Sequence, residues 1–103
     1  MAALDTNTIR NILIQKGFEK VYLVEKEHNC VLFLGKIGDF NIIIGIYSGV
    51  RSLYAKIVDA SKVLEPYWKC EYLEYVPHGL YTFSNNIDEL IEKIVSKAKI
   101  IIK

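Results

Sequence analysis

One stretch of the sequence, residues 40–47, is apolar on both faces of the strand that it predicts. Side chains of a strand point alternately to opposite faces, so a strand with one face in water alternates apolar and polar residues. Here one face is apolar throughout, with Phe40, Ile42, Ile44 and Ile46. Ile43 and Tyr47 make the other face apolar as well. Such a strand belongs in the centre of a sheet that is covered on both sides.

The hydrophobic period divides the rest of the chain into a helix, a run of strands and a second helix. Residues 6–16 have helical spacing between capping candidates at residues 5–8 and Gly17. Asn86, followed three residues later by Glu89, predicts the start of a final helix. Strands are expected at residues 21–24, 31–34, 40–47, 53–58, 68–76 and 80–83. Residues 59–66 favour no single structure, because Pro66 conflicts with a helix there.

Short turns between these strands indicate antiparallel neighbours. We therefore expect one α+β domain over residues 1–103, a two-layer sandwich. In it, an antiparallel β-meander of four to six strands is flanked by an N-terminal and a C-terminal helix. A chain of 103 residues, 51% of them hydrophobic, is sufficient for one core.

Two helices of about three turns each cover only one face of such a sheet. The second face then has no covering layer within the sequence, and we expect it to carry Ile43, Tyr47, Leu53 and Ile57. Large exposed apolar patches mark interfaces, so a homodimer or a protein target is expected to cover this face. Gly45 agrees with that expectation, because a glycine inside a strand removes a side chain where something comes close.

Aromatic residues concentrate in residues 66–78, which contain the only tryptophan and three of the seven tyrosines. Tryptophan and tyrosine dominate interface hot spots, although strand propensity alone also accounts for aromatics. The interface residues that we predict are Trp68, Tyr75, Tyr47, Ile43, Leu53 and Ile101. Ile101 belongs to a run of three isoleucines that must be buried on this chain's own core or on a partner.

No catalytic residue, metal site or cofactor is indicated. Cys70 and His78 suit an activated thiol, but no third orienting residue is marked, and a lone strand cysteine is usually a small core residue. The two cysteines and two histidines lack the short paired spacings of structural zinc sites. We expect both cysteines to be reduced, and a Cys30–Cys70 disulfide stays open as an alternative.

Charge and hydropathy exclude some partners. The net charge is +1, with basic residues scattered among acidic ones, so nucleic acid is not an expected partner. The first residues lack a basic start followed by an apolar run, and no apolar run approaches the roughly 20 residues that span a bilayer. The expected location is therefore cytoplasmic, without membrane contact.

These observations predict a small, intracellular, non-enzymatic protein-binding domain of the inhibitor, immunity or adaptor kind. Its size and composition would suit a gene of a virus or another mobile element. One alternative is a small enzyme or ligand-binding domain that uses residues 68–78. A further alternative is a single-stranded nucleic-acid binder, since aromatic residues on a sheet can stack on bases.

Overall fold

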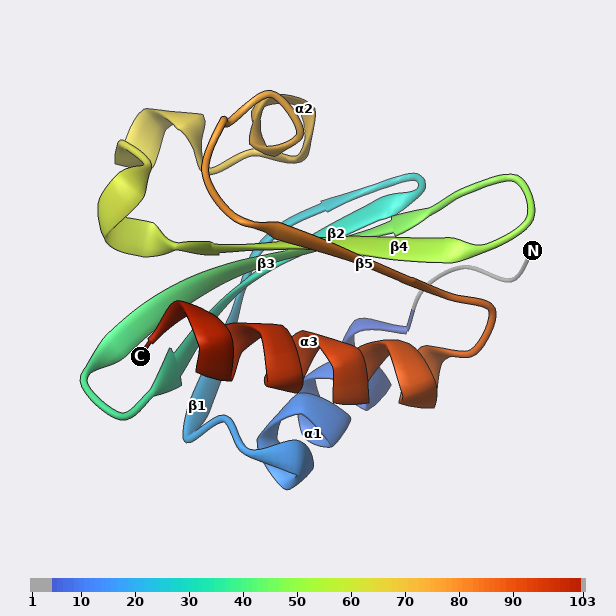
Figure 1. Ribbon diagram of the computed structural model, residues 1–103. Helices are drawn as coiled ribbons and strands as arrows, with labels where there is room; N and C mark the ends of the chain where they lie inside the picture. The colour runs from blue at the N-terminus through green and yellow to red at the C-terminus, as the bar shows by residue number, and fades with distance from the viewer. Residues whose placement is uncertain (1–4, 103) are drawn as a thin grey trace.

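The structure is a computed structural model that describes residues 5–102, so residues 1–4 and 103 of the predicted domain lie outside the described part. Five antiparallel strands form one sheet in the order β1-β2-β3-β4-β5. Their bounds are β1 Lys20–Glu27, β2 Cys30–Ile37, β3 Phe40–Ser48, β4 Leu53–Asp59 and β5 Leu80–Ser84. Helices α1 (Thr6–Lys16) and α3 (Ile87–Ile101) lie together on one face of the sheet (Figure 1). The predicted α+β meander with two flanking helices is thus confirmed.

Both long helices begin at the caps that the sequence predicts. The Asp5 carboxylate accepts hydrogen bonds from the backbone N–H groups of Asn7 and Thr8, at 3.1 and 3.2 Å. The Asn86 side chain accepts one from the N–H of Glu89, at 3.2 Å. These side chains satisfy backbone donors that have no partner inside the helix, and so fix where each helix starts.

The larger core fills the space between the sheet and the two helices. It includes Ile42, Ile44 and Ile46 of β3, as predicted, and also Leu53 and Ile57 of β4. The prediction that Leu53 and Ile57 lie on the second face is wrong. In the β3–β4 pairing Ile57 lies beside Ile44, and partners across a ladder share a face.

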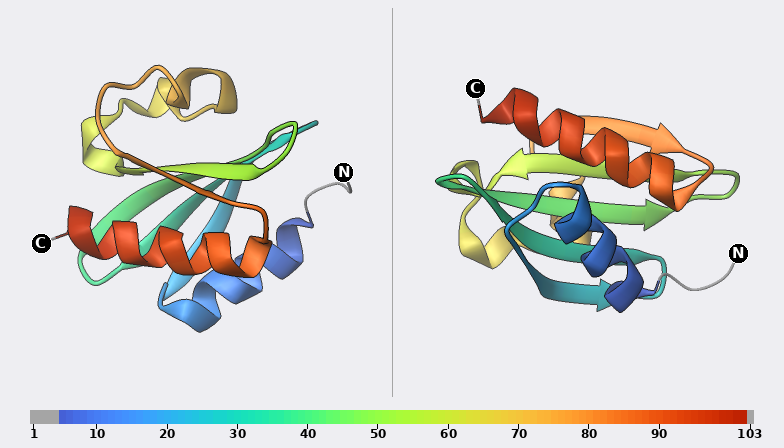
Figure 2. Two further views of the ribbon diagram at one scale, coloured as in Figure 1. Left: turned by 45° about the vertical axis from the view of Figure 1, so that its right-hand side comes forward. Right: turned by 90° about the horizontal axis from the view of Figure 1, so that it is seen from below.

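The connection between β4 and β5 forms a layer on the second face of the sheet (Figures 1 and 2). It contains two 3₁₀ helices, Ala60–Lys62 and Glu65–Tyr67, and the short helix α2, Cys70–Leu73. The prediction of a strand over residues 68–76 is therefore wrong. Cys70 and Leu73 are three residues apart, so a helical turn directs both side chains to the sheet, which a strand would not do.

This layer buries a second, smaller core. The sheet contributes Leu32, Ile43, Tyr47 and Val58, and the layer contributes Val63, Cys70 and Leu73. Ile43 and Leu73 are both 0% exposed. The prediction of an uncovered second face is wrong, because residues 60–79 of the same chain provide the missing layer.

A disulfide joins Cys30 of β2 to Cys70 of α2, with 6.2 Å between their Cα atoms. The expectation of two reduced cysteines is therefore wrong. Two hydrogen bonds hold the same point of the layer. The Cys70 N–H donates to Glu25 Oε1 at 2.7 Å, and the Tyr47 hydroxyl donates to the Cys70 carbonyl at 3.1 Å. At Cys70 the layer is thus attached to the sheet by one covalent bond and two polar contacts.

Candidate functional site

Three of the predicted interface residues are buried within the chain. Tyr47 is 5% exposed, Ile43 0% and Leu53 6%. Ile43 and Tyr47 lie beneath the layer, whereas Leu53 lies on the opposite face, under the helices. They were selected because the second face was expected to be uncovered, whereas residues 60–79 cover it.

The other three predicted interface residues lie nearer the surface. The Trp68 indole is half-buried and donates its Nε1–H to the Val63 carbonyl at 2.8 Å. Ile101 is half-buried and packs against the larger core. Tyr75 is 85% exposed. A role for Trp68, Tyr75 and Ile101 in an interface stays a prediction.

The structure instead brings together an aromatic row that crosses three strands on the second face of the sheet. Tyr47 stacks on Tyr54 with 4.9 Å between ring centroids, and Tyr54 lies 6.0 Å from Phe83. Tyr81 continues the row, 6.5 Å from Phe83. Tyr47 is buried under the layer, whereas Tyr81 is 41% and Phe83 57% exposed. The row therefore emerges at the surface along β5.

Residues 74–76 of the layer hold this row by polar contacts. The Tyr81 hydroxyl donates to the Glu74 carbonyl at 3.1 Å, and the Tyr54 hydroxyl donates to the Glu74 carboxylate at 3.4 Å. Between these tyrosines, Lys56 is only 2% exposed and donates its Nζ–H to the Val76 carbonyl. Its ammonium group also lies 5.2 Å from the centroid of the Tyr81 ring. Hydrogen bonds to the layer thus hold Tyr54, Lys56 and Tyr81, the neighbours of Phe83 in the row.

The surroundings change the ionisation of these groups. Burial, and next the Glu74 carboxylate, raise the pKa of Tyr47, Tyr54 and Tyr81. Burial lowers the pKa of Lys56, and the Glu74 charge opposes that shift. At neutral pH the three phenols therefore stay protonated and keep donating their hydrogen bonds.

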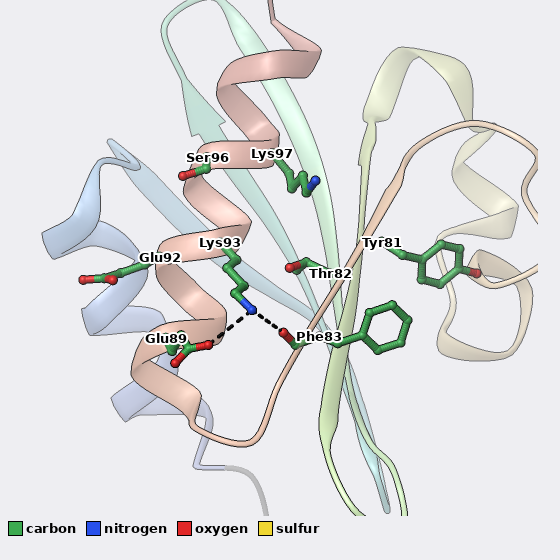
Figure 3. A pocket seen from close by; sticks show the side chains of 8 residues that line it. All are labelled: Tyr81, Thr82, Phe83, Glu89, Glu92, Lys93, Ser96 and Lys97. Carbon is green, nitrogen blue, oxygen red and sulfur yellow. Dashed lines mark hydrogen bonds and ion pairs between the residues drawn. The ribbon is translucent and has the colours of Figure 1, made fainter.

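The outer edge of β5 lies beside α3 (Figure 3). The Lys93 ammonium donates to the Phe83 carbonyl at 2.8 Å and pairs with the Glu89 carboxylate at 3.2 Å. The Phe83 carbonyl therefore points away from β4. A hollow between the strand and the helix is lined by Tyr81, Thr82, Phe83, Glu89, Glu92, Lys93, Ser96 and Lys97.

The opposite edge of the sheet is less open. The pairing of β1 with β2 has an irregularity between Leu23 and Glu25, and the Arg10 side chain donates to the Val21 carbonyl at 2.8 Å. A side chain covers one carbonyl at each edge, but the bulge in β1 discourages further strand pairing there. By contrast, β5 pairs with β4 without a shift of register.

The residues considered for catalysis do not assemble. Because Cys70 is bonded to Cys30, its sulfur is no thiol that His78 could activate. His78 lies on the exposed part of the layer. Within residues 5–102, no group of three or more His, Cys, Asp or Glu side chains is placed to hold a metal ion.

Tyr54, Tyr81 and Phe83 are not among the site residues predicted from the sequence. One signal was available, because Tyr81 and Phe83 have the same parity in a strand whose alternate residue, Thr82, is polar. Prolines often flank edge strands, and Pro66 and Pro77 lie on either side of the strand expected at residues 68–76. The edge strand that carries Tyr81 and Phe83 instead follows Pro77, at β5.

No protein-family model, curated protein or solved structure matches the chain. Among the described residues, no helix combines the length and apolar character needed to cross a membrane. A function must therefore be inferred from the aromatic row and the strand edge beside it.

Proposed function

We propose that this chain is a non-enzymatic protein-binding domain of the inhibitor, immunity or adaptor kind, with its docking surface on β4 and β5. The surface, here called the aromatic face, consists of Tyr54, Tyr81 and Phe83. The observation that carries this proposal is the exposure of Phe83 and Tyr81, 57% and 41%, side by side on an edge strand. Exposed aromatic side chains with well-packed neighbours are the usual energetic centres of protein interfaces.

The aromatic face is also held in place before a partner arrives. Glu74 accepts the hydroxyl hydrogen bonds of both Tyr54 and Tyr81, and Tyr54 stacks on buried Tyr47. Side chains already fixed in the free protein lose less rotamer entropy on binding. These contacts favour a role of the aromatic face in recognition over the alternative that its aromatic residues are exposed by chance.

Charge around the face favours a protein over nucleic acid. Glu74 lies at the face itself, and it lines a further hollow together with Glu27, Glu71 and Tyr47. Carboxylates repel the phosphates on which nucleic-acid affinity depends. Arginine and lysine of a protein partner that lie over Glu74, on the side of the sheet away from α3, would gain from the same carboxylates, and arginine also stacks on exposed aromatic rings.

A protein target is favoured here over the homodimer. The sheet-on-sheet homodimer was expected because the second face had no cover, and the layer at residues 60–79 supplies that cover. With that face covered, the reason for a sheet-on-sheet homodimer is gone, whereas the exposed aromatic side chains of β5 still favour an interface with another protein.

The disulfide bears on the proposed location. Disulfides persist in oxidising compartments and are rare in reducing cytosol, except in heat-adapted hosts. A cytoplasmic location would therefore require a host of that kind. We propose that the binding-competent form is the oxidised one, because Cys30–Cys70 holds the layer that supplies Glu74.

Affinity capture from a lysate of the encoding organism tests the proposal. The wild-type chain is compared with a Tyr81→Ala/Phe83→Ala variant and with a matched Tyr22→Ala/Leu23→Ala control. Tyr22 and Leu23 are similarly exposed, 54% and 49%, but lie at the opposite edge of the sheet. A protein retained by the wild type and the control but lost from the aromatic-face variant supports the proposal. Equal retention by all three folded variants contradicts it.

A further inference from the structure

We infer that the open edge of β5 accepts an extended segment of the partner as a sixth strand, and that this segment alternates apolar and acidic side chains. The inference rests on the proposed function and specifies the chemistry of the partner. Three features carry it: the direction of the peptide groups of β5, the two different walls beside its edge, and the lysines of α3.

The peptide groups of β5 provide the first feature. Lys93 reaches the Phe83 carbonyl from the side opposite β4, so the peptide groups of Phe83 point outward. Peptide groups two residues apart in a strand point the same way, so those of Tyr81 also face outward. An added strand at about 4.8 Å from β5 would find donors and acceptors at both residues.

The side chains on the two sides of the β5 edge differ in chemistry. Figure 3 shows Tyr81 and Phe83 pointing away from α3, while Lys93 and Lys97 extend from α3 on the other side of the strand. Side chains of an added strand alternate between these sides. Every second residue would therefore meet two exposed aromatic rings, and the residues between them would meet the side chains of α3 that line the hollow. Both glutamates of this lining are paired, Glu92 with Lys16 and Glu89 with Lys93, which leaves the charge of Lys97.

The lysines of α3 determine which charge is favoured on the partner residues that face this helix. Lys97 is half-buried and forms no ion pair within residues 5–102. In the free protein, Lys93 donates a hydrogen bond to the Phe83 carbonyl. This contact discourages other chains from pairing with the β5 edge. An incoming N–H that takes this carbonyl would displace the Lys93 ammonium, which keeps its ion pair with Glu89. The charge open to an incoming carboxylate is therefore that of Lys97. A segment that alternates apolar and acidic residues would therefore place apolar side chains against the aromatic rings and carboxylates near Lys97.

The probe for this inference is a synthetic peptide of about nine residues that alternates valine and glutamate, added to isotope-labelled protein. We expect chemical-shift changes at the amides of Tyr81 and Phe83 and along the facing side of α3, with slower hydrogen exchange of the two β5 amides. A peptide with lysine in place of glutamate should bind at least about tenfold more weakly. Methylation of the backbone nitrogens that face β5 should abolish binding, because strand addition depends on main-chain hydrogen bonds.

Two charge reversals on α3 complete the test. Lys97→Glu should weaken binding of the glutamate peptide about fivefold or more, because it reverses a charge within the hollow. Lys99→Glu should leave binding unchanged, because Lys99 is exposed on the same helix but does not line the hollow. No binding up to millimolar peptide, indifference to glutamate or lysine, or shift changes away from β5 and α3 would each overturn the inference. If capture of a protein still depends on Phe83, only strand addition fails and the proposed function stands.

Discussion

Leu73 occupies the space above Gly45 that a side chain would otherwise fill. A Cβ atom placed on Gly45 would lie 2.6 Å from Leu73 Cδ2 and 3.0 Å from the Tyr47 ring. Leu73 is fully buried, so its methyl group has little room to withdraw. The close approach that a glycine inside this strand predicts is therefore made by the chain's own layer.

Gly45→Ala should destabilise the fold by about 1–3 kcal/mol, because the added methyl overpacks the contact with Leu73. Urea unfolding measures the change in the free energy of unfolding. Leu73→Ala alone should cost about 2–5 kcal/mol through the cavity that it leaves. In the double variant the new methyl enters that cavity, so the combined loss should be smaller than the sum. Additivity within about 0.5 kcal/mol would show that the two residues do not compete for space.

The disulfide closes a loop between Cys30 and Cys70, which are 40 residues apart in the sequence. In the chain-entropy model, a loop of this length makes the disulfide worth about 4 kcal/mol. We expect reductant to lower the unfolding temperature of the wild type by many degrees. A Cys30→Ala/Cys70→Ala variant should start at the lower value and not respond to reductant. Two titratable thiols in the untreated protein would contradict the assignment.

The elements that the sequence predicted correctly are those set by local physics. Helix α3 follows from the Asn86 cap and an apolar stripe, and β3 follows from its apolar run; both signals lie within the element itself. The layer over residues 60–79 has no comparable period. Its position depends on contacts such as Leu73 with Gly45, between residues far apart in the chain.

The faces of β4 and β5 were harder to assign for a related reason. The turn before β4 decides which parity of that strand faces the helices, and one residue of difference moves Leu53 from one core to the other. The aromatic face depends on the same register, since Tyr54 lies beside Phe83 only in the observed pairing. The sequence shows which residues are aromatic, but it does not show which of them lie side by side in the sheet.

Asn86→Ala should destabilise the protein by about 1 kcal/mol, because the N–H of Glu89 loses its side-chain acceptor at the start of α3. Asn85→Ala is a matched control, since Asn85 is also exposed and lies one residue before the cap. Thermal unfolding should separate the two variants by a few degrees. Equal effects of the two substitutions would argue against the cap.

Alkaline titration should detect the buried part of the aromatic row. Burial and the Glu74 charge raise the pKa values of Tyr47, Tyr54 and Tyr81 above the ordinary 10.0. In the folded protein, part of the ultraviolet change from tyrosine ionisation should therefore occur at higher pH than in urea. Because the unfolded chain loses these protons first, the free energy of unfolding should fall as the pH rises above 10.0. Coincident titration curves for the folded and unfolded protein would contradict the arrangement.

Lys56 should impose the opposite dependence at lower pH. Burial lowers its pKa below the ordinary 10.5, with the Glu74 charge opposing, so the unfolded chain binds more protons between the two values. The free energy of unfolding should therefore rise with pH through that window, until tyrosine ionisation reverses the trend. Lys56→Met keeps the length of the side chain without its charge and should abolish the rise. The exposed Lys62 gives the control, since Lys62→Met should keep the wild-type slope. Urea unfolding from neutral pH to about pH 10 measures the slopes, and an unchanged rise in Lys56→Met would show that another group causes it.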